Sequence, residues 1–160
     1  MLDVVVFLAC RRATPEGPPG PGALARLPYT LEGVTYTWQI DDPAAEPPFR
    51  VEELWFYLRF VRTAPRGFTR RLALRVLSVN DDGSRTRLPY PAVPPTTVPY
   101  DLGAFRFPGH SQVTSRPAVV RDLVFPRRGR YEFRLLMRRR KSTWHRSRWA
   151  WVASHYIALE

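Results

Sequence analysis

Apolar and polar residues alternate along several stretches of the chain, as expected of strands that bury one face. These stretches are rich in aromatic and β-branched residues, which are common in strands. The alternation predicts strands within residues 34–40, 54–60, 71–76, 130–138 and 149–159. In the last stretch the odd-numbered apolar residues share one face: Trp149, Trp151, Ile157 and Leu159. We therefore expect the two tryptophans to point into the core.

Two stretches also fit a helix. Within residues 49–62 four apolar residues recur at helical spacing: Val51, Leu54, Leu58 and Val61. The density of aromatic residues and the flanking prolines favour a strand there. Residues 118–124 are similarly undecided between helix and strand.

Turn and loop signals separate the predicted strands. Residues 80–84 (Asn-Asp-Asp-Gly-Ser) are typical of a hairpin turn because Asp and Gly tolerate positive φ, and residues 127–129 resemble a second tight connection. Residues 11–28 and 89–110 are rich in proline, which lacks an amide donor, and are predicted to be long loops. Together these signals predict a single all-β domain over residues 1–160. We expect an antiparallel β-sandwich of about seven to eight strands, immunoglobulin-like or C2-like, with little helix.

Four short segments carry a resemblance to a known family. They are Leu8-Ala9-Cys10, Leu31-Glu32-Gly33-Val34, Asp81-Asp82-Gly83, and Phe125-Pro126 followed by Gly129-Arg130-Tyr131-Glu132-Phe133. The chain resembles a family of short uncharacterised bacterial proteins, a domain of unknown function predicted to be a β-sandwich. The resemblance covers most of the chain and implies the fold, but it supplies no activity and no catalytic residues. The chain departs from the family pattern in a longer second proline-rich loop and an extra Arg- and Trp-rich C-terminal segment.

The formal net charge of +11 favours binding to nucleic acid, an anionic membrane or an acidic protein. Ten of the 25 basic residues fall between Arg127 and Arg148. Apart from Lys141 these 25 residues are all arginine, and 17 residues of the chain are proline, so the excess also fits a GC-rich coding sequence. Charge therefore indicates a class of partner without identifying one.

The basic and aromatic C-terminal region is the main candidate site. Arginine supplies forked donors for phosphates and tryptophan supplies a stacking platform, a mixture suited to single-stranded nucleic acid. The candidate anion-binding residues are Arg127, Arg128, Arg138, Arg139, Arg140, Lys141, Trp144, Arg146 and Arg148. The alternative is that these cations merely solvate a turn. Trp144 discriminates between the two, since no core alternation includes it.

A second basic surface depends on how the strands pair. Three arginines share the polar face of residues 130–138, and two more lie on the polar face of residues 71–76: Arg130, Arg134 and Arg138, with Arg71 and Arg75. If these strands are neighbours, the five form one basic stripe. Alternatively, Glu132, Glu52 or Glu53 pairs with these charges.

The sequence offers little catalytic chemistry. No nucleophile elbow or Gly-rich phosphate loop accompanies the three histidines, His110, His145 and His155. We expect His155 to be structural and Cys10, which ends an apolar strand, to be buried and unreactive. Calcium binding by residues 81–82 is a minor alternative because only two acids are local. We predict no enzyme activity, no metal site and no cofactor; a site assembled from distant residues is the alternative.

These features predict a non-enzymatic interaction module whose C-terminal surface contacts nucleic acid or another polyanion, such as an acidic protein. The alternative is a structural or adaptor subunit that docks to a protein partner, or to a second copy of the chain, through a sheet edge or the proline-rich loops. The apolar run 2–10 is shorter than the roughly 20 residues that span a bilayer, and Asp3 stands where a secretory signal is basic. We therefore expect no membrane span. Because the chain also has a single cysteine, we expect a cytoplasmic location.

Overall fold

The fold is all-β over the part of the chain that the computed structural model describes. This part comprises residues 2–16, 29–40, 42, 44–62, 66–88, 100–107, 113–138 and 149–160. Its regular elements are eleven strands in three sheets, none of them closed, and no helix occurs among these residues. The all-β prediction is confirmed at this level.

The first main sheet has the order β1-β5-β9, with both pairs antiparallel. Its strands are β1 (Leu2–Cys10), β5 (Phe49–Arg62) and β9 (Val113–Phe125). The strand prediction for residues 49–62 is confirmed, and residues 118–124 also form a strand. In β5 every second residue is buried, from Leu54 to Phe60, which is the period of a strand with one face in a core.

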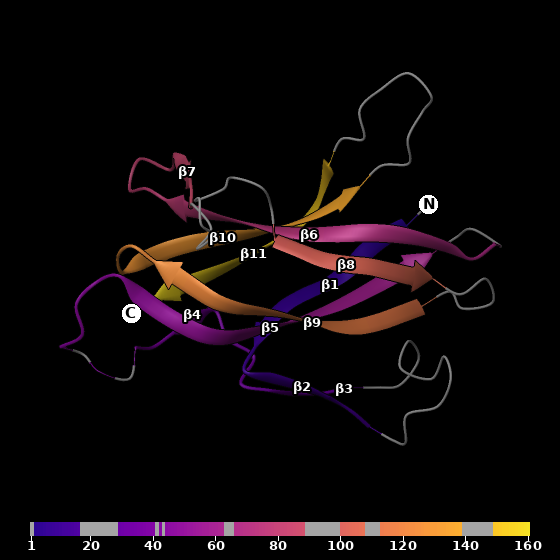
Figure 1. Cartoon of the computed structure of the whole chain (residues 1–160), viewed down its shortest axis with the longest axis horizontal. Helices are drawn as coiled ribbons and strands as arrows, with labels where there is room; N and C mark the ends of the chain where they lie inside the picture. Colours follow the sequence, from indigo (N-terminus) through magenta and orange to yellow (C-terminus); the bar gives the residue numbers. More distant parts are fainter. Residues whose placement is uncertain are drawn as a thin grey trace.

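The second main sheet has the order β4-β11-β10-β6-β7, and β8 also pairs with β6. Its strands are β4 (Thr37–Trp38), β6 (Phe68–Val79), β7 (Arg85–Arg87), β8 (Tyr100–Phe107), β10 (Gly129–Arg138) and β11 (Trp149–Leu159). All pairs are antiparallel except β11 with β4. In Figure 1 the long strand β6, drawn in magenta, runs beside β10 and β8.

The inner faces of the two main sheets share one hydrophobic core. The ring of Phe56 on β5 lies 5.2 Å from that of Phe133 on β10, and Phe125 on β9 lies 4.6 Å from Tyr131. Tyr131, Phe133 and Leu135 are buried, so the apolar face predicted for this strand is confirmed. The sheets are therefore layered in a sandwich-like arrangement.

The predicted strand over residues 34–40 is wrong except at Thr37–Trp38. The Tyr36 side chain is 64% exposed and Val34 is also exposed, although both belong to the alternating pattern. The backbone of this segment bonds to two different sheets, since the Thr35 amide donates to the Ala9 carbonyl on β1, whereas the Tyr36 and Trp38 carbonyls accept from the amides of Ala158 and Glu160 at the end of β11. Alternation without a continuous ladder beside it does not make a strand.

Parts of both predicted proline-rich loops are strands, which is why the strand count exceeds the prediction. In the first loop β2 (Arg12–Pro15) pairs with β3 (Tyr29–Glu32) as a separate two-stranded sheet. In the second, β8 lies between Pro99 and Pro108, which flank the strand and so leave its amides free to pair. Apart from Arg11 and Glu16, the rest of both predicted loops, residues 17–28, 89–99 and 108–110, lies outside the described residues.

The predicted turns are present. Between β6 and β7 the amide of Gly83 donates to the Asn80 carbonyl at 2.9 Å, and Gly83 has a φ of +79°. Gly129, at the start of β10, has a φ of +139°. Both glycines therefore occupy backbone conformations that a side chain would disfavour.

Candidate functional site

A β-bulge in β11 decides which side chains face solvent. Along β10 and β11, Leu135 pairs with Ala153 whereas the next residue, Leu136, pairs with Trp151, so Val152 is extra. The extra residue reverses the parity of the strand. Trp151 consequently lies on the face opposite to the buried Ile157 and is 57% exposed. The prediction that Trp149 and Trp151 point into the core is wrong, because simple alternation does not hold across the bulge: Trp149, which precedes the bulge like Trp151, pairs with Arg138 and is only partly buried.

The side chains of β6, β7, β10 and β11 that point away from the core form a surface that we call the outer face. It contains Arg71, Arg75, Arg85, Arg87, Arg130, Glu132, Arg134, Arg138, Trp151, Ser154 and Tyr156. The pairing on which the predicted basic stripe depends is present, since β10 and β6 are neighbours and Arg134 is directly opposite Arg75. Seven arginines of three strands thus share one sheet face.

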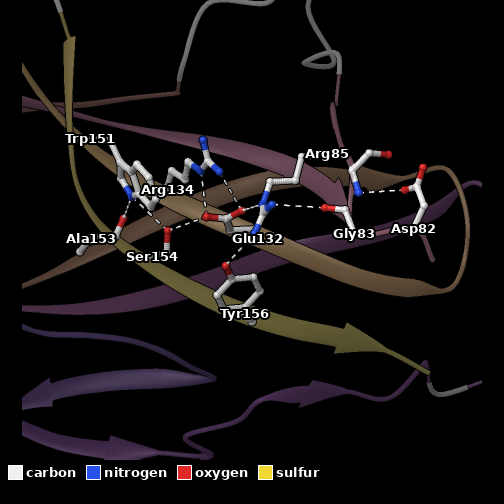
Figure 2. Close-up of polar contacts among 10 residues, drawn as sticks. Asp82, Gly83, Arg85, Glu132, Arg134, Trp151, Ala153, Ser154 and Tyr156 are labelled. Atoms are coloured by element: carbon white, nitrogen blue, oxygen red, sulfur yellow. Dashed lines mark hydrogen bonds and ion pairs between the residues drawn. The ribbon is translucent and has the colours of Figure 1, made fainter. Parts of the chain in front are cut away.

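Glu132 lies at the centre of the outer face and is fully buried. Its carboxylate accepts from Arg134 Nε at 2.8 Å and Nη2 at 3.1 Å, from Ser154 Oγ at 2.7 Å, and from Arg85 Nε. Burial alone would raise the pKa of Glu132, but the hydrogen bonds from Arg134, Ser154 and Arg85 lower it from 4.5 to about 2. Figure 2 shows this carboxylate between the two guanidinium groups. Glu132 therefore stays ionised and holds the two cations over the sheet.

Trp151 and Arg134 form a stacked pair on the same face. The Arg134 guanidinium lies 4.3 Å from the centre of the Trp151 ring, within the range of a cation–π interaction. The indole Nε1 donates to the Ala153 carbonyl and to Ser154 Oγ, both at 3.0 Å. Ser154 thus links Trp151 to Glu132 in one hydrogen-bonded network (Figure 2). The orientation of the exposed ring is consequently fixed by its neighbours.

Part of the outer-face charge is neutralised. Besides Glu132, the carboxylate of Asp101 on β8 accepts from Arg71, with Nε 3.0 and 2.8 Å from its two oxygens. This hydrogen bond, with the nearby charge of Arg138, lowers the pKa of Asp101. The alternative that Glu132 pairs with this stripe is confirmed. Glu53 instead lies 3.5 Å from Arg121 between β5 and β9, in the other main sheet.

The predicted site residues do not all gather in one place. Arg127 and Arg128 precede β10 whereas Arg138 ends it, and a strand of ten residues is about 30 Å long. Arg127 donates to Asn80 Oδ1 at 2.7 Å, and the Arg128 guanidinium lies 5.2 Å from the Phe49 ring. These two arginines are therefore separated from Arg138 by the length of the strand.

The other six predicted site residues lie outside the described residues: Arg139, Arg140, Lys141, Trp144, Arg146 and Arg148. The residues on either side of this segment are described. Arg138 and Trp149 pair directly across β10 and β11, so these two flanking residues lie together at one end of the outer face.

Sequence reasoning missed Arg85, Arg87 and Tyr156 as members of this surface. The signal for the two arginines was present, since they alternate directly after the predicted hairpin turn. Tyr156, which is 38% exposed, could have been found from its parity relative to the buried His155. Its hydroxyl accepts from Arg85 Nη2 at 3.4 Å.

The remaining chemical candidates among the described residues have structural roles, whereas His110 and His145 lie outside the described residues. His155 is buried, its Nε2 lies 3.2 Å from the Thr35 carbonyl oxygen, and desolvation lowers its pKa. Cys10 is buried as predicted, and burial raises the pKa of its thiol. In the β6–β7 turn Asp82 accepts from the Ser84 amide at 2.8 Å. Among the described residues no three His, Cys, Asp or Glu side chains are grouped so that they could hold a metal ion.

Comparison with known proteins gives little further information. No family model and no curated protein matches the chain. A similar solved structure is Pseudomonas fluorescens alkylpurine DNA glycosylase AlkC bound to DNA containing an abasic site analog. The match covers 99% of this chain and 30% of that chain, with a TM-score of 0.48 and 11% sequence identity. Similarity this low supports no inference about function. The described residues contain no helix long and apolar enough to cross a membrane.

Proposed function

We propose that the protein is a non-enzymatic interaction module whose outer face binds nucleic acid. The observation that carries the proposal is the charge of this one surface. Seven arginines of three neighbouring strands lie on this face, and among the described residues Glu132 and Asp101 form ion pairs with members of this group. A surface with this balance attracts polyanions through long-range steering and the release of counterions.

The pairing of strands adds a local reason. Arg75 and Arg134 are directly opposite each other on β6 and β10, and like charges in that position repel. Glu132 offsets part of this repulsion through its contacts with Arg134. A phosphate chain lying across the two strands would attract both guanidinium groups, so this pairing supports an anionic ligand.

The alternative, an adaptor that docks through a sheet edge, fits the edges formed by β9, β7 and β8 less well. Strand β9 carries Pro117, an arginine on its core-facing side at Arg116, and a positive φ at Asp122. Strand β7 has only three residues, and β8 contains a register shift next to Gly103. Short edges, prolines, inward-pointing charges and bulges all hinder the addition of another strand. We therefore prefer the outer face as the binding surface.

We extend the proposal to fold subclass and location. The two layered sheets, with antiparallel pairs and a shared aromatic core, support an immunoglobulin-like or C2-like sandwich as the finer class. The single cysteine, which is buried, supports the cytoplasmic location expected from the sequence.

Fluorescence anisotropy with labelled oligonucleotides over a salt series tests the proposal. We expect binding that weakens steeply between about 50 and 200 mM salt. Arg87→Gln should lower the slope of log Kd against log salt by about one unit, because it removes one phosphate contact. Arg59→Gln is the matched control, since Arg59 is equally an exposed strand arginine but lies on β5 of the other sheet. Absent binding, or binding that salt does not weaken, would contradict the proposal.

A further inference from the structure

The exposed indole of Trp151 is held in place before any ligand arrives. Its Nε1 is bonded to the Ala153 carbonyl and to Ser154 Oγ, and Ser154 is in turn bonded to the buried Glu132. More than half of the side chain nevertheless remains accessible. An aromatic surface whose orientation is already fixed loses little conformational freedom when a planar group stacks on it.

A cation lies over one face of this ring. The Arg134 guanidinium is 4.3 Å from the ring centre. Its Nε and Nη2 groups donate to Glu132. Because a guanidinium has five N–H donors, these two bonds to Glu132 do not use all of them. A nucleotide offers an aromatic base joined to a phosphate. The pair Trp151 and Arg134 therefore presents the two complementary groups in contact with each other, an aromatic stacking surface and a donor for phosphate.

The tethering of Trp151 argues against recognition of a duplex through its bases. In double-stranded nucleic acid the bases are stacked inside and expose only their edges in the grooves. An indole bonded to its own strand through Nε1 cannot extend into a groove to reach those edges. A base can come to the ring only where it is already unstacked, as in a single strand.

We propose that the Trp151–Arg134 pair stacks an unpaired base and thereby makes the outer face selective for single-stranded over double-stranded nucleic acid. This inference rests on the proposed function. Tyr156, the next exposed aromatic residue along β11, sits opposite Glu132, and Trp151 sits opposite Leu136. Those partners are four positions apart along β10, which corresponds to about 13 Å. A ligand that reaches both rings must therefore be longer than a dinucleotide.

The test uses the full chain and three labelled probes of about 12 nucleotides, within the usual size of a single-strand site. The probes are a single-stranded oligothymidine, a duplex of the same length, and a single strand with the same phosphates but abasic sugars. We expect the oligothymidine to bind at least about fivefold more tightly than either of the others, the lower end of what one stacked base contributes.

Trp151→Ala should weaken oligothymidine binding by about 5- to 150-fold while leaving the abasic strand unchanged, because only the base contact is lost. Trp151→Phe should restore most of the affinity. Tyr36→Ala is the control for removal of an exposed aromatic residue away from the outer face. Circular dichroism establishes that each variant is folded, and the three-probe comparison on the wild-type chain stands without any variant.

The outcomes separate the two proposals. If none of the probes binds, both proposals are wrong. If all three bind equally and Trp151→Ala changes nothing, the outer face contacts phosphates only; the single-strand inference is then overturned while the proposed function stands.

Discussion

Removing the charge of Glu132 should destabilise the fold by an amount that depends on pH. Glu132 is fully buried and contacts two arginines and Ser154, which lower its pKa from 4.5 to about 2. Because one pKa unit is worth about 1.4 kcal/mol, ionised Glu132 contributes about 3 kcal/mol at about pH 7. This agrees with the roughly 3–5 kcal/mol measured when one partner of a buried ion pair is removed.

The sign follows from the lowered pKa. The contribution is complete above the unfolded-state pKa of 4.5 and is lost as the pH falls through the folded-state value of about 2. At about pH 3, between the two values, roughly 1.5 kcal/mol should remain. The stability difference between the wild type and Glu132→Gln should therefore shrink by about half between neutral pH and pH 3.

Urea denaturation of both proteins at the two pH values measures this difference. The matched control is Glu53→Gln, whose carboxylate is partly exposed and lies 3.5 Å from Arg121. An exposed pair of this kind contributes at most about 1 kcal/mol. A loss below about 1 kcal/mol for Glu132→Gln at neutral pH, or a difference that pH does not change, would refute the reasoning.

Three further predictions concern the fold. Phe133→Ala should lower the unfolding free energy by about 3–5 kcal/mol in urea, because Phe133 is fully buried beside Phe56; a loss under about 1 kcal/mol would contradict the shared core. Gly83→Ala should cost about 1–2 kcal/mol through its positive φ alone, since no atom lies within 4 Å of the added Cβ; an unchanged Tm would argue against this turn. Burial lowers the pKa of His155 below 6.5, so the unfolded chain binds a proton more readily and the unfolding free energy should decrease as the pH falls below about 6.5. His155→Gln should remove this pH dependence in urea denaturation. A pH dependence that persists in the variant would show that another group causes it.

The local sequence pattern predicted the buried and polar faces correctly where a strand is regular. In β10 the alternation of Tyr131, Phe133 and Leu135 with charged residues correctly predicted a buried and a polar face. The turn after β6 and the burial of Cys10 also followed from residue chemistry alone. In each case the physical cause, side-chain alternation or tolerance of positive φ, acts over a few neighbouring residues.

The pattern failed where pairing partners decide the outcome. The apolar residues Val34 and Tyr36 alternate like a strand but are exposed, since only a short stretch beside them bonds to β11. The prolines around Tyr100–Phe107 predict a loop, although the amides of this segment pair with β6. Neither result can be read from residues within the segment.

The sequence by itself determined an all-β fold, the polar face of β10 and an excess of arginine. The tertiary structure alone decided that β6 lies next to β10, which places Arg75 opposite Arg134. It also placed an extra residue, Val152, in β11, and so turned Trp151 outward. Alternation is a property of one strand, whereas register and bulges are properties of two strands, so the candidate surface exists only once the strands are paired.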